Sequence, residues 1–180
     1  MGTVYTVGHG ARTAEEFLSV LQEAGIEVLA DVRRYPGSRR HPHFGREALA
    51  ANLSQAGIEY QWWGASMGGR RKADPASDAR HSAWRVEAFR AYASHMETPD
   101  FREALSRLID LSEQRRLAVM CSEALWWRCH RRLIADAVVA AGSEAVHIGR
   151  GAPQTHELTE FARIEAGTLL YDNAESPNLS

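Results

Sequence analysis

Short apolar runs alternate with amphipathic segments along most of this chain. Runs such as Thr3–Val7 and Leu117–Cys121 have the length and composition of β-strands. The run Ile26–Val32 is mostly apolar, which is typical of a strand that is buried on both faces. The pattern predicts strands at 3–7, 26–32, 58–63, 117–121 and 144–148, and a further short strand at 168–171.

The segments between these runs carry the signals of helices. Thr13 and Glu16 have capping-box spacing ahead of an apolar face, and Gly25 ends that helix. Thr98 is followed by a proline at the first helical position. We therefore expect helices after Thr13, over 46–56, over 83–97, from Thr98 onward and over 128–141. The polar, glycine-rich segment 64–82 predicts a long loop, a kind of segment that is usually functional or mobile.

This alternation of strands and helices predicts the fold class. Strands separated by helices favour right-handed crossovers and a mainly parallel sheet. The 180 residues fit one domain, and no internal repeat or linker interrupts them. We therefore predict a single three-layer α/β domain over 1–172, with helices on both faces of the sheet, and a loose tail over 173–180.

Composition indicates the class of protein and the compartment to which this domain belongs. A hydrophobic share of 44% and a charged share of 24% are ordinary for a globular protein. No apolar run approaches the roughly 20 residues that cross a bilayer, and two cysteines make no disulfide framework. These features predict a reducing, cytoplasmic setting and no membrane partner. The net charge of −2 gives no global attraction to nucleic acid.

Arginine dominates the basic residues. Lys72 is the one lysine among the 21 basic side chains. Arginine suits two-pronged binding of phosphate or carboxylate groups. A genomic base composition that favours arginine codons explains the same bias, so both interpretations stay open.

Polar side chains follow four of the predicted strands. His9 follows the first strand, Asp31 closes the second, Cys121 closes the fourth and Arg150 comes after the fifth. Because ligands of parallel sheets bind beyond the carboxyl ends of the strands, these positions mark a candidate site. We expect one concave pocket to be lined by His9, Arg33, Cys121, Glu123 and His130.

The densest cluster of reactive side chains runs from Cys121 to Arg131. Cys121 precedes a helix N-terminus, where the dipole and free amides stabilise a thiolate, so we predict a nucleophile with a lowered pKa. Glu123, His130 and His9 are the candidates for acid–base catalysis. The alternative is a buried Cys121 that packs as a small apolar side chain, beside a Glu123 that caps a helix.

The loop from Arg33 to His43 is a candidate anion site, because it holds four arginines. Asp31 would fix one of these arginines, and a solvated basic loop is the alternative. The predicted ligand-binding residues are Asp31, Arg33, Ser38, Arg39, Gly69 and Arg131. Four tryptophans either stack on a base or sugar or pack in the core: Trp62, Trp63, Trp126 and Trp127.

A metal site is a weaker interpretation of the same cluster. Suitable zinc or iron ligands are present at Cys121, Glu123, Cys129, His130 and His147. The paired Cys-x-x-Cys steps of a zinc knuckle are missing, and Cys129 and His130 point roughly 100° apart on a helix. We assign no metal ligand, and the sequence indicates no particular cofactor.

With these motifs in place, the chain resembles the bacterial and archaeal domain-of-unknown-function family 488. The resemblance rests on Thr6-Val7-Gly8-His9, Asp31-Val32-Arg33 with Pro36 and Ser38, Gly68-Gly69, Cys121-Ser122-Glu123 with Cys129-His130-Arg131, and His147-Ile148. It implies a compact α/β domain and a prokaryotic cytoplasmic protein. It supplies no reaction.

The order of motifs is also similar to the layout of rhodanese and cysteine-phosphatase domains. Those domains cradle an anion in a Cys-x5-Arg loop. Counted from Cys121, that spacing falls on Trp127, and Arg128 stands one residue late.

Three functional hypotheses follow from these residues. The leading one is an enzyme that acts on a phosphate-bearing or nucleotide-like ligand at a Cys/Glu/His/Arg pocket. The second is a nucleic-acid or nucleotide binding module without catalysis, and the third is a metal-binding protein.

Overall fold

The computed structural model describes residues 1–173, and most of its strands form one sheet. The strand order is β3-β2-β4-β1-β5-β6, in which neighbours are parallel except for the antiparallel pair β5–β6. A separate hairpin pairs β7 with β8. The strands are β1 (Thr3–Gly8), β2 (Val28–Asp31), β3 (Glu59–Trp62), β4 (Leu117–Cys121), β5 (Glu144–His147), β6 (Gln154–Thr155), β7 (Arg163–Glu165) and β8 (Thr168–Leu170).

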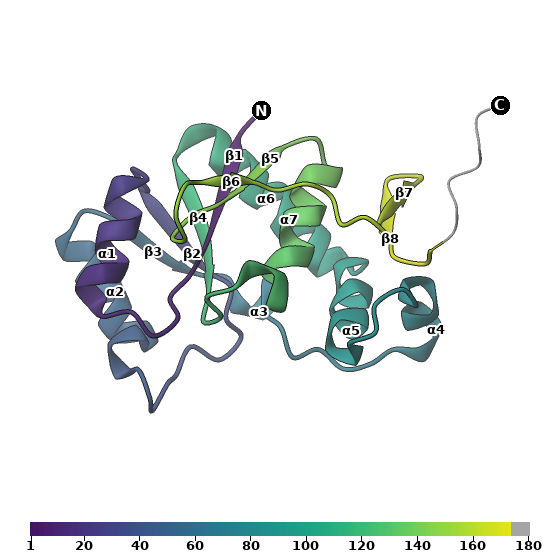
Figure 1. Ribbon diagram of the computed structural model, residues 1–180, viewed down its shortest axis with the longest axis horizontal. Coiled ribbons are helices and arrows are strands. Elements are labelled where there is room, and N and C mark those ends of the chain that lie inside the picture. Colours follow the sequence, from purple (N-terminus) through teal and green to yellow (C-terminus); the bar gives the residue numbers. More distant parts are fainter. Residues whose placement is uncertain (174–180) are drawn as a thin grey trace.

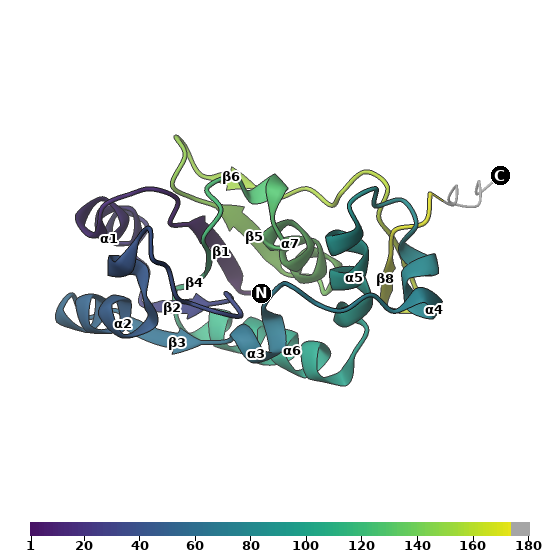
Figure 2. The same ribbon diagram turned by 90° about the horizontal axis from the view of Figure 1, so that it is seen from below.

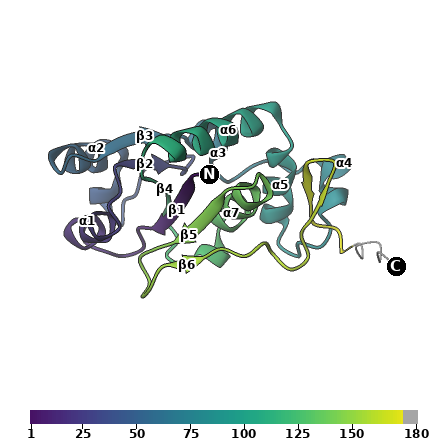
Figure 3. The ribbon, with the colours of Figure 1, turned by 90° about the horizontal axis from the view of Figure 1, so that it is seen from above.

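Helices cover both faces of the sheet, as the strand–helix alternation predicted. On one face α1 (Ala14–Glu23) and α2 (Arg46–Gln55) pack together. The other face is covered by α5 (Glu87–Met96), α6 (Pro99–Gln114) and α7 (Arg131–Ala140). Figures 2 and 3 show the strands running between these two groups of helices. The three-layer α/β architecture is confirmed.

The alternation of side chains along β4 separates the two halves of the core. Leu117, Val119 and Cys121 pack on the side of α5, α6 and α7. Ala118 and Met120 pack on the side of α1 and α2. Successive side chains of a strand point to opposite faces, so Cys121 necessarily faces α7.

The local signals for helix starts are mostly confirmed. Thr13 and Glu16 form the predicted capping box at α1, and the Thr98 hydroxyl accepts a hydrogen bond from the Phe101 amide at the start of α6. The helix predicted over 128–141 begins only at Arg131, because 126–128 form the 3₁₀ turn η3 (Trp126–Arg128).

The prediction of one long loop over 64–82 is wrong. The segment contains the short helices α3 (Gly64–Met67) and α4 (Pro75–Asp78) and the 3₁₀ turn η2 (Ala79–His81). Asp74 caps α4 by accepting from the Ala76 amide, and Met67 is fully buried in the core. Tertiary packing therefore orders a segment whose glycine-rich composition is typical of a loop.

Two further features complete the description. Figure 1 shows α1 and α2 at one end of the molecule and α4 with the β7–β8 hairpin at the other. Within the described residues no helix has the length and apolar character needed to cross a membrane. The predicted loose tail lies, apart from Asn173, outside the described residues.

Candidate functional site

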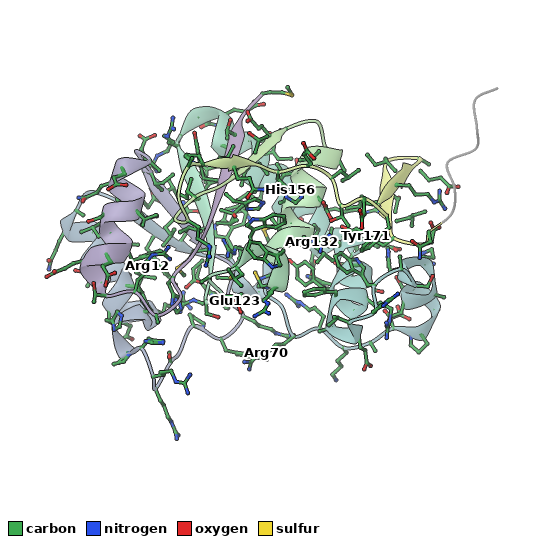
Figure 4. The ribbon with its side chains drawn as sticks, viewed as in Figure 1. Arg12, Arg70, Glu123, Arg132, His156 and Tyr171 are labelled. Carbon is green, nitrogen blue, oxygen red and sulfur yellow. The ribbon has the colours of Figure 1, made fainter. Side chains whose placement is uncertain are left out.

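A pocket of about 520 Å³ opens beyond the carboxyl ends of β1, β2 and β4. All five side chains that were expected to share a pocket line it: His9, Arg33, Cys121, Glu123 and His130. Figure 4 shows Glu123 and Arg70 on the same side of the molecule, away from the end where β1 begins. The lining also includes Arg34, Tyr35 and Arg40 of the candidate anion loop, and Cys129, which the sequence offered only as a possible metal ligand. Sequence reasoning gave no site role to three further lining residues: Arg70, Phe89 and Tyr92.

The register of the sheet brings these side chains together. Gly8 of β1 pairs with Cys121 of β4, and Asp31 of β2 pairs with Met120. The pairing continues past the strands, because the His9 amide donates to the Cys121 carbonyl at 3.0 Å. Position 8 needs a glycine, because an added Cβ would lie 1.9 Å from the Glu123 carbonyl oxygen.

The two cysteines form the centre of the site. Their Sγ atoms lie 3.1 Å apart, and both thiols are free. The Arg131 Nε atom donates to Cys121 Sγ at 3.0 Å, and the Arg131 backbone amide donates to Cys129 Sγ at 3.4 Å. Arg131 thus contacts both sulfurs, and it supplies the arginine that the Cys-x5-Arg spacing does not provide at position 127.

Burial and hydrogen bonding shift the pKa values of the two thiols in opposite directions. Burial, followed by the neighbouring Cys129, raises the pKa of Cys121, whose side chain is 2% exposed. The hydrogen bond from Cys121, helped by the charge of Arg131, lowers the pKa of the partly exposed Cys129 to about 6. The expectation of a lowered pKa at Cys121 is therefore wrong. The thiolate belongs on Cys129, because its sulfur is less desolvated and accepts from both neighbours.

A buried hydrogen-bond chain holds Arg131 from behind. Arg131 Nη1 donates to Thr6 Oγ1 at 3.3 Å, and Thr6 Oγ1 lies 2.6 Å from His147 Nδ1. The His147 Nε2 atom lies 2.9 Å from His156 Nδ1, and His156 Nε2 lies 2.8 Å from Asp136 Oδ1. Figure 4 shows His156 and Tyr171 in this interior region, and the Tyr171 hydroxyl donates to the other Asp136 oxygen.

The two ends of this chain fix the hydrogen bonds next to them. Arg131 can only donate, so Thr6 Oγ1 accepts from it, and the Asp136 carboxylate accepts from His156 Nε2. Between these ends the His147 ring contacts both Thr6 and His156, and Trp126 stacks flat on it at 4.2 Å.

Several arginines also line the pocket. Arg33 is held by Asp31 through two side-chain hydrogen bonds, Nε to Oδ1 at 2.9 Å and Nη2 to Oδ2 at 2.7 Å. Asp31 thus fixes one arginine, as the sequence suggested. Arg70 adopts a left-handed backbone with φ of 59°, which is uncommon for a residue with a side chain and is found more often at functional sites. Arg34 and Arg70 both lie over the ring of Tyr35.

The predicted ligand-binding residues occupy different places around this pocket. Arg33, Ser38 and Gly69 line it. Asp31 and Arg131 are almost fully buried behind the lining, and each holds a residue that does line it. Arg39 is exposed outside the pocket, and its neighbour Arg40 lines the wall instead.

Two histidines present neutral nitrogens to the pocket. Burial lowers the pKa of His9 and of His130 to about 4. His9 Nδ1 donates to the Gly10 carbonyl at 2.8 Å, which leaves Nε2 as the acceptor. His130 Nε2 donates to the Val32 carbonyl at 3.1 Å, which leaves Nδ1 as the acceptor, beside Gly69. Both rings are therefore neutral at neutral pH, and each has one nitrogen that can accept a hydrogen bond.

Glu123 takes a local structural role. Its Oε1 atom accepts from the Leu125 amide at 3.0 Å, and its carbonyl oxygen accepts from Arg131 Nη2 at 2.6 Å. The alternative of a helix-capping Glu123 is not what the structure shows, because neither η3 nor α7 has a side-chain cap. The hydrogen bond to the Leu125 amide holds the turn that carries the chain from Cys121 toward Cys129.

The metal and tryptophan hypotheses gain no support here. Among residues 1–173, no group of three or more His, Cys, Asp or Glu side chains is arranged to hold a metal ion. None of the four tryptophans lines the pocket, whose aromatic walls come from Tyr35, Phe89 and Tyr92.

Comparison with known proteins places this site within one family. The family model described as "Domain of unknown function DUF488" matches residues 13–138. No curated protein and no solved structure matches the chain. The matched range contains β2, β4 and both cysteines.

Proposed function

The chain belongs to the DUF488 family, and from the chemistry of its pocket we propose that it is an enzyme that uses a cysteine thiolate on a small phosphate-bearing or nucleotide-like ligand. The observation that carries this proposal is the pair of thiols 3.1 Å apart that shares Arg131 and lines a pocket with several arginines. Cys129 is the nucleophile in this proposal, and Cys121 supports it.

The thiolate is the first part of the argument. Thiolates, not thiols, attack electrophiles, and cations and backbone amides stabilise them. Cys129 accepts from Cys121 and from the Arg131 amide just ahead of α7, and its pKa is lowered to about 6. At neutral pH this side chain is therefore mostly ionised.

The charge of the pocket is the second part. Arg33, Arg34, Arg40 and Arg70 line it together with Ser38. Guanidinium groups bind phosphate oxygens through paired hydrogen bonds, which are stronger than bonds between neutral groups. The ring of Tyr35 adds an apolar wall suited to an organic part of the ligand.

Proton transfer is the third part. His9 Nε2 is a neutral acceptor on the pocket surface, beside Arg33 Nη1 at 3.5 Å. In this proposal the neutral Nε2 atom accepts a hydrogen bond from the ligand and takes its proton as the reaction proceeds. His130 Nδ1 offers a second acceptor in the pocket lining, next to Gly69.

Two neighbouring arginines allow a matched test. Calorimetry with inorganic phosphate and with adenosine monophosphate should show binding that weakens as salt is added. Arg40→Gln removes a lining charge and should weaken binding about tenfold, which corresponds to about 1.4 kcal/mol. Arg39→Gln removes an exposed charge from the same loop and should leave affinity unchanged. Equal effects of the two substitutions, or no binding to the unmodified protein, would reject the proposal.

A further inference from the structure

The two sulfurs, 3.1 Å apart, lie almost close enough to form a disulfide bond. A disulfide bond is about 2.05 Å long, so the Sγ atoms need to approach by about 1 Å to form one. Cys121 ends β4, and Cys129 follows the 3₁₀ turn η3, outside both the sheet and α7. A small movement of this connecting segment therefore suffices, and neither sheet nor helix has to break.

The exposure of the two sulfurs sets an order of reaction. Cys129 is partly exposed and carries the lowered pKa, whereas Cys121 is only 2% exposed. An incoming electrophile therefore meets Cys129 first. Cys121 is then the nearest group able to attack whatever forms on Cys129.

The charge and size of the pocket select the electrophile. Its volume of about 520 Å³ lies within the range of pockets that hold small organic molecules. The lining arginines favour a ligand with negative groups, and a sulfur electrophile suits attack by one thiol and release by another.

We propose that Cys129 and Cys121 carry out thiol–disulfide exchange with the disulfide of a small anionic thiol. This inference rests on the proposed function, because it uses the same thiolate and the same arginines. It adds the substrate class and a second reacting residue, Cys121.

The exchange proceeds in two balanced steps. The Cys129 thiolate attacks one sulfur of the substrate R–S–S–R, which forms the mixed disulfide Cys129–S–S–R and releases R–S⁻. Cys121 then loses its proton to the released thiolate or to water and attacks the Cys129 sulfur. This step forms Cys121–S–S–Cys129 and releases the second R–S⁻. Two electrons pass from the protein thiols to the substrate, and an external dithiol reductant restores the pair.

Glutathione disulfide and cystamine are matched probes, because one disulfide carries carboxylates and the other carries only amines. We expect the reduced protein to lose the mass of two hydrogen atoms with glutathione disulfide, and peptide mapping to show a Cys121–Cys129 link. Attraction by the lining arginines should make this reaction about tenfold faster than with cystamine. The exposed-loop variant Arg39→Gln should react like the unmodified protein.

Cysteine variants separate the two steps. Cys121→Ser should stop at one bound glutathione on Cys129, and Cys129→Ser should not react while folded, as judged by circular dichroism. A protein that gains glutathione without forming the internal link, or a folded Cys129→Ser variant that reacts at the original rate, overturns the inference. If a variant fails to fold, peptide mapping of the unmodified protein still shows whether the Cys121–Cys129 disulfide forms.

The same experiments distinguish this inference from the proposed function. Phosphate binding without any internal disulfide rejects the exchange reaction and leaves the anion-binding thiol site standing. Equal rates with glutathione disulfide and cystamine show that the arginines take no part, and that result counts against the proposed function as well.

Discussion

His147 should make the stability of the protein fall as the pH is lowered. Burial, followed by the neighbouring His156 and Arg131, lowers the pKa of His147 to about 3. The ring is 5% exposed and is packed against Trp126, with Thr6 and His156 at its two nitrogens. Its pKa in the unfolded chain is about 6.5, so the unfolded state binds a proton in a range where the folded state does not.

The difference between the folded and unfolded pKa of His147 sets the sign and size of its effect on stability. The contribution of His147 to stability is fully present above pH 6.5 and is lost as the pH falls from there toward 3. At pH 4.5 the unfolded chain is protonated at this position and the folded protein is not. The loss is then about 2–3 kcal/mol, at 1.4 kcal/mol for each unit of pKa difference that the pH has crossed.

The perturbation that isolates this contribution is His147→Gln. The substitution costs stability at pH 7.5, about 1–3 kcal/mol, because hydrogen bonds of the buried chain are lost or bent. That cost is measured where both states carry a neutral ring, so it serves as the control. The variant lacks the titrating group, so its stability should fall less with pH, and the two curves should converge by about 2–3 kcal/mol at pH 4.5.

Urea unfolding followed by circular dichroism, at several pH values from 7.5 to 4.5, measures both curves. Parallel curves for the two proteins would mean that His147 titrates in the folded state as it does in the unfolded one. In that case the buried chain from Arg131 to Asp136 is open to water.

Two substitutions test the supports of the pocket. Asp31→Asn should destabilise the protein by about 3–5 kcal/mol in urea unfolding, because it leaves the buried Arg33 charge unpaired; a cost below about 1 kcal/mol would mean that Arg33 finds water instead. Gly8→Ala should cost about 1–3 kcal/mol or more, because the added Cβ meets the Glu123 carbonyl. Gly37→Ala is the control, since an added Cβ there meets nothing within 4 Å. Equal effects at the two glycines would contradict the close contact between Gly8 and the Glu123 carbonyl.

Most of the framework of the site could be predicted from the sequence. Apolar runs placed β1, β2 and β4, and the ends of parallel strands lie at one edge of the sheet. That rule brought His9, Arg33 and Cys121 to one pocket before any contact was known. The capping residues Thr13 and Thr98 were equally local signals, because a cap involves only the first turn of its own helix.

What the sequence missed depends on distances across the fold. Nothing in the spacing of Cys121 and Cys129 shows that their sulfurs lie 3.1 Å apart, since η3 occupies part of the interval. The sequence prediction at Cys121 favoured the helix dipole over the alternative of burial, and in the fold burial has the larger effect on the pKa of this thiol. Arg39 and Arg40 are chemically identical neighbours, and only the path of the loop decides which one lines the pocket.

The chain through His147 and His156 was also beyond sequence reasoning. His156 follows β6, and its partner Asp136 lies in the middle of α7. Neither residue stands near a motif or at the end of a parallel strand. A long-range pair of this kind becomes visible only once the antiparallel β5–β6 pairing is known.

The pH dependence of alkylation at Cys129 tests the central claim most directly. Iodoacetamide labelling of the unmodified protein, with peptides that separate Cys129 from Cys121, gives the ionisation midpoint of each thiol. We predict a midpoint near pH 6 at Cys129, so that about 90% of this thiol is ionised at pH 7, against about 3% for a free cysteine. Cys121 should stay unlabelled until the protein unfolds. A Cys129 midpoint at or above about 8.5, the value of a free cysteine, would contradict the assignment of the thiolate to Cys129.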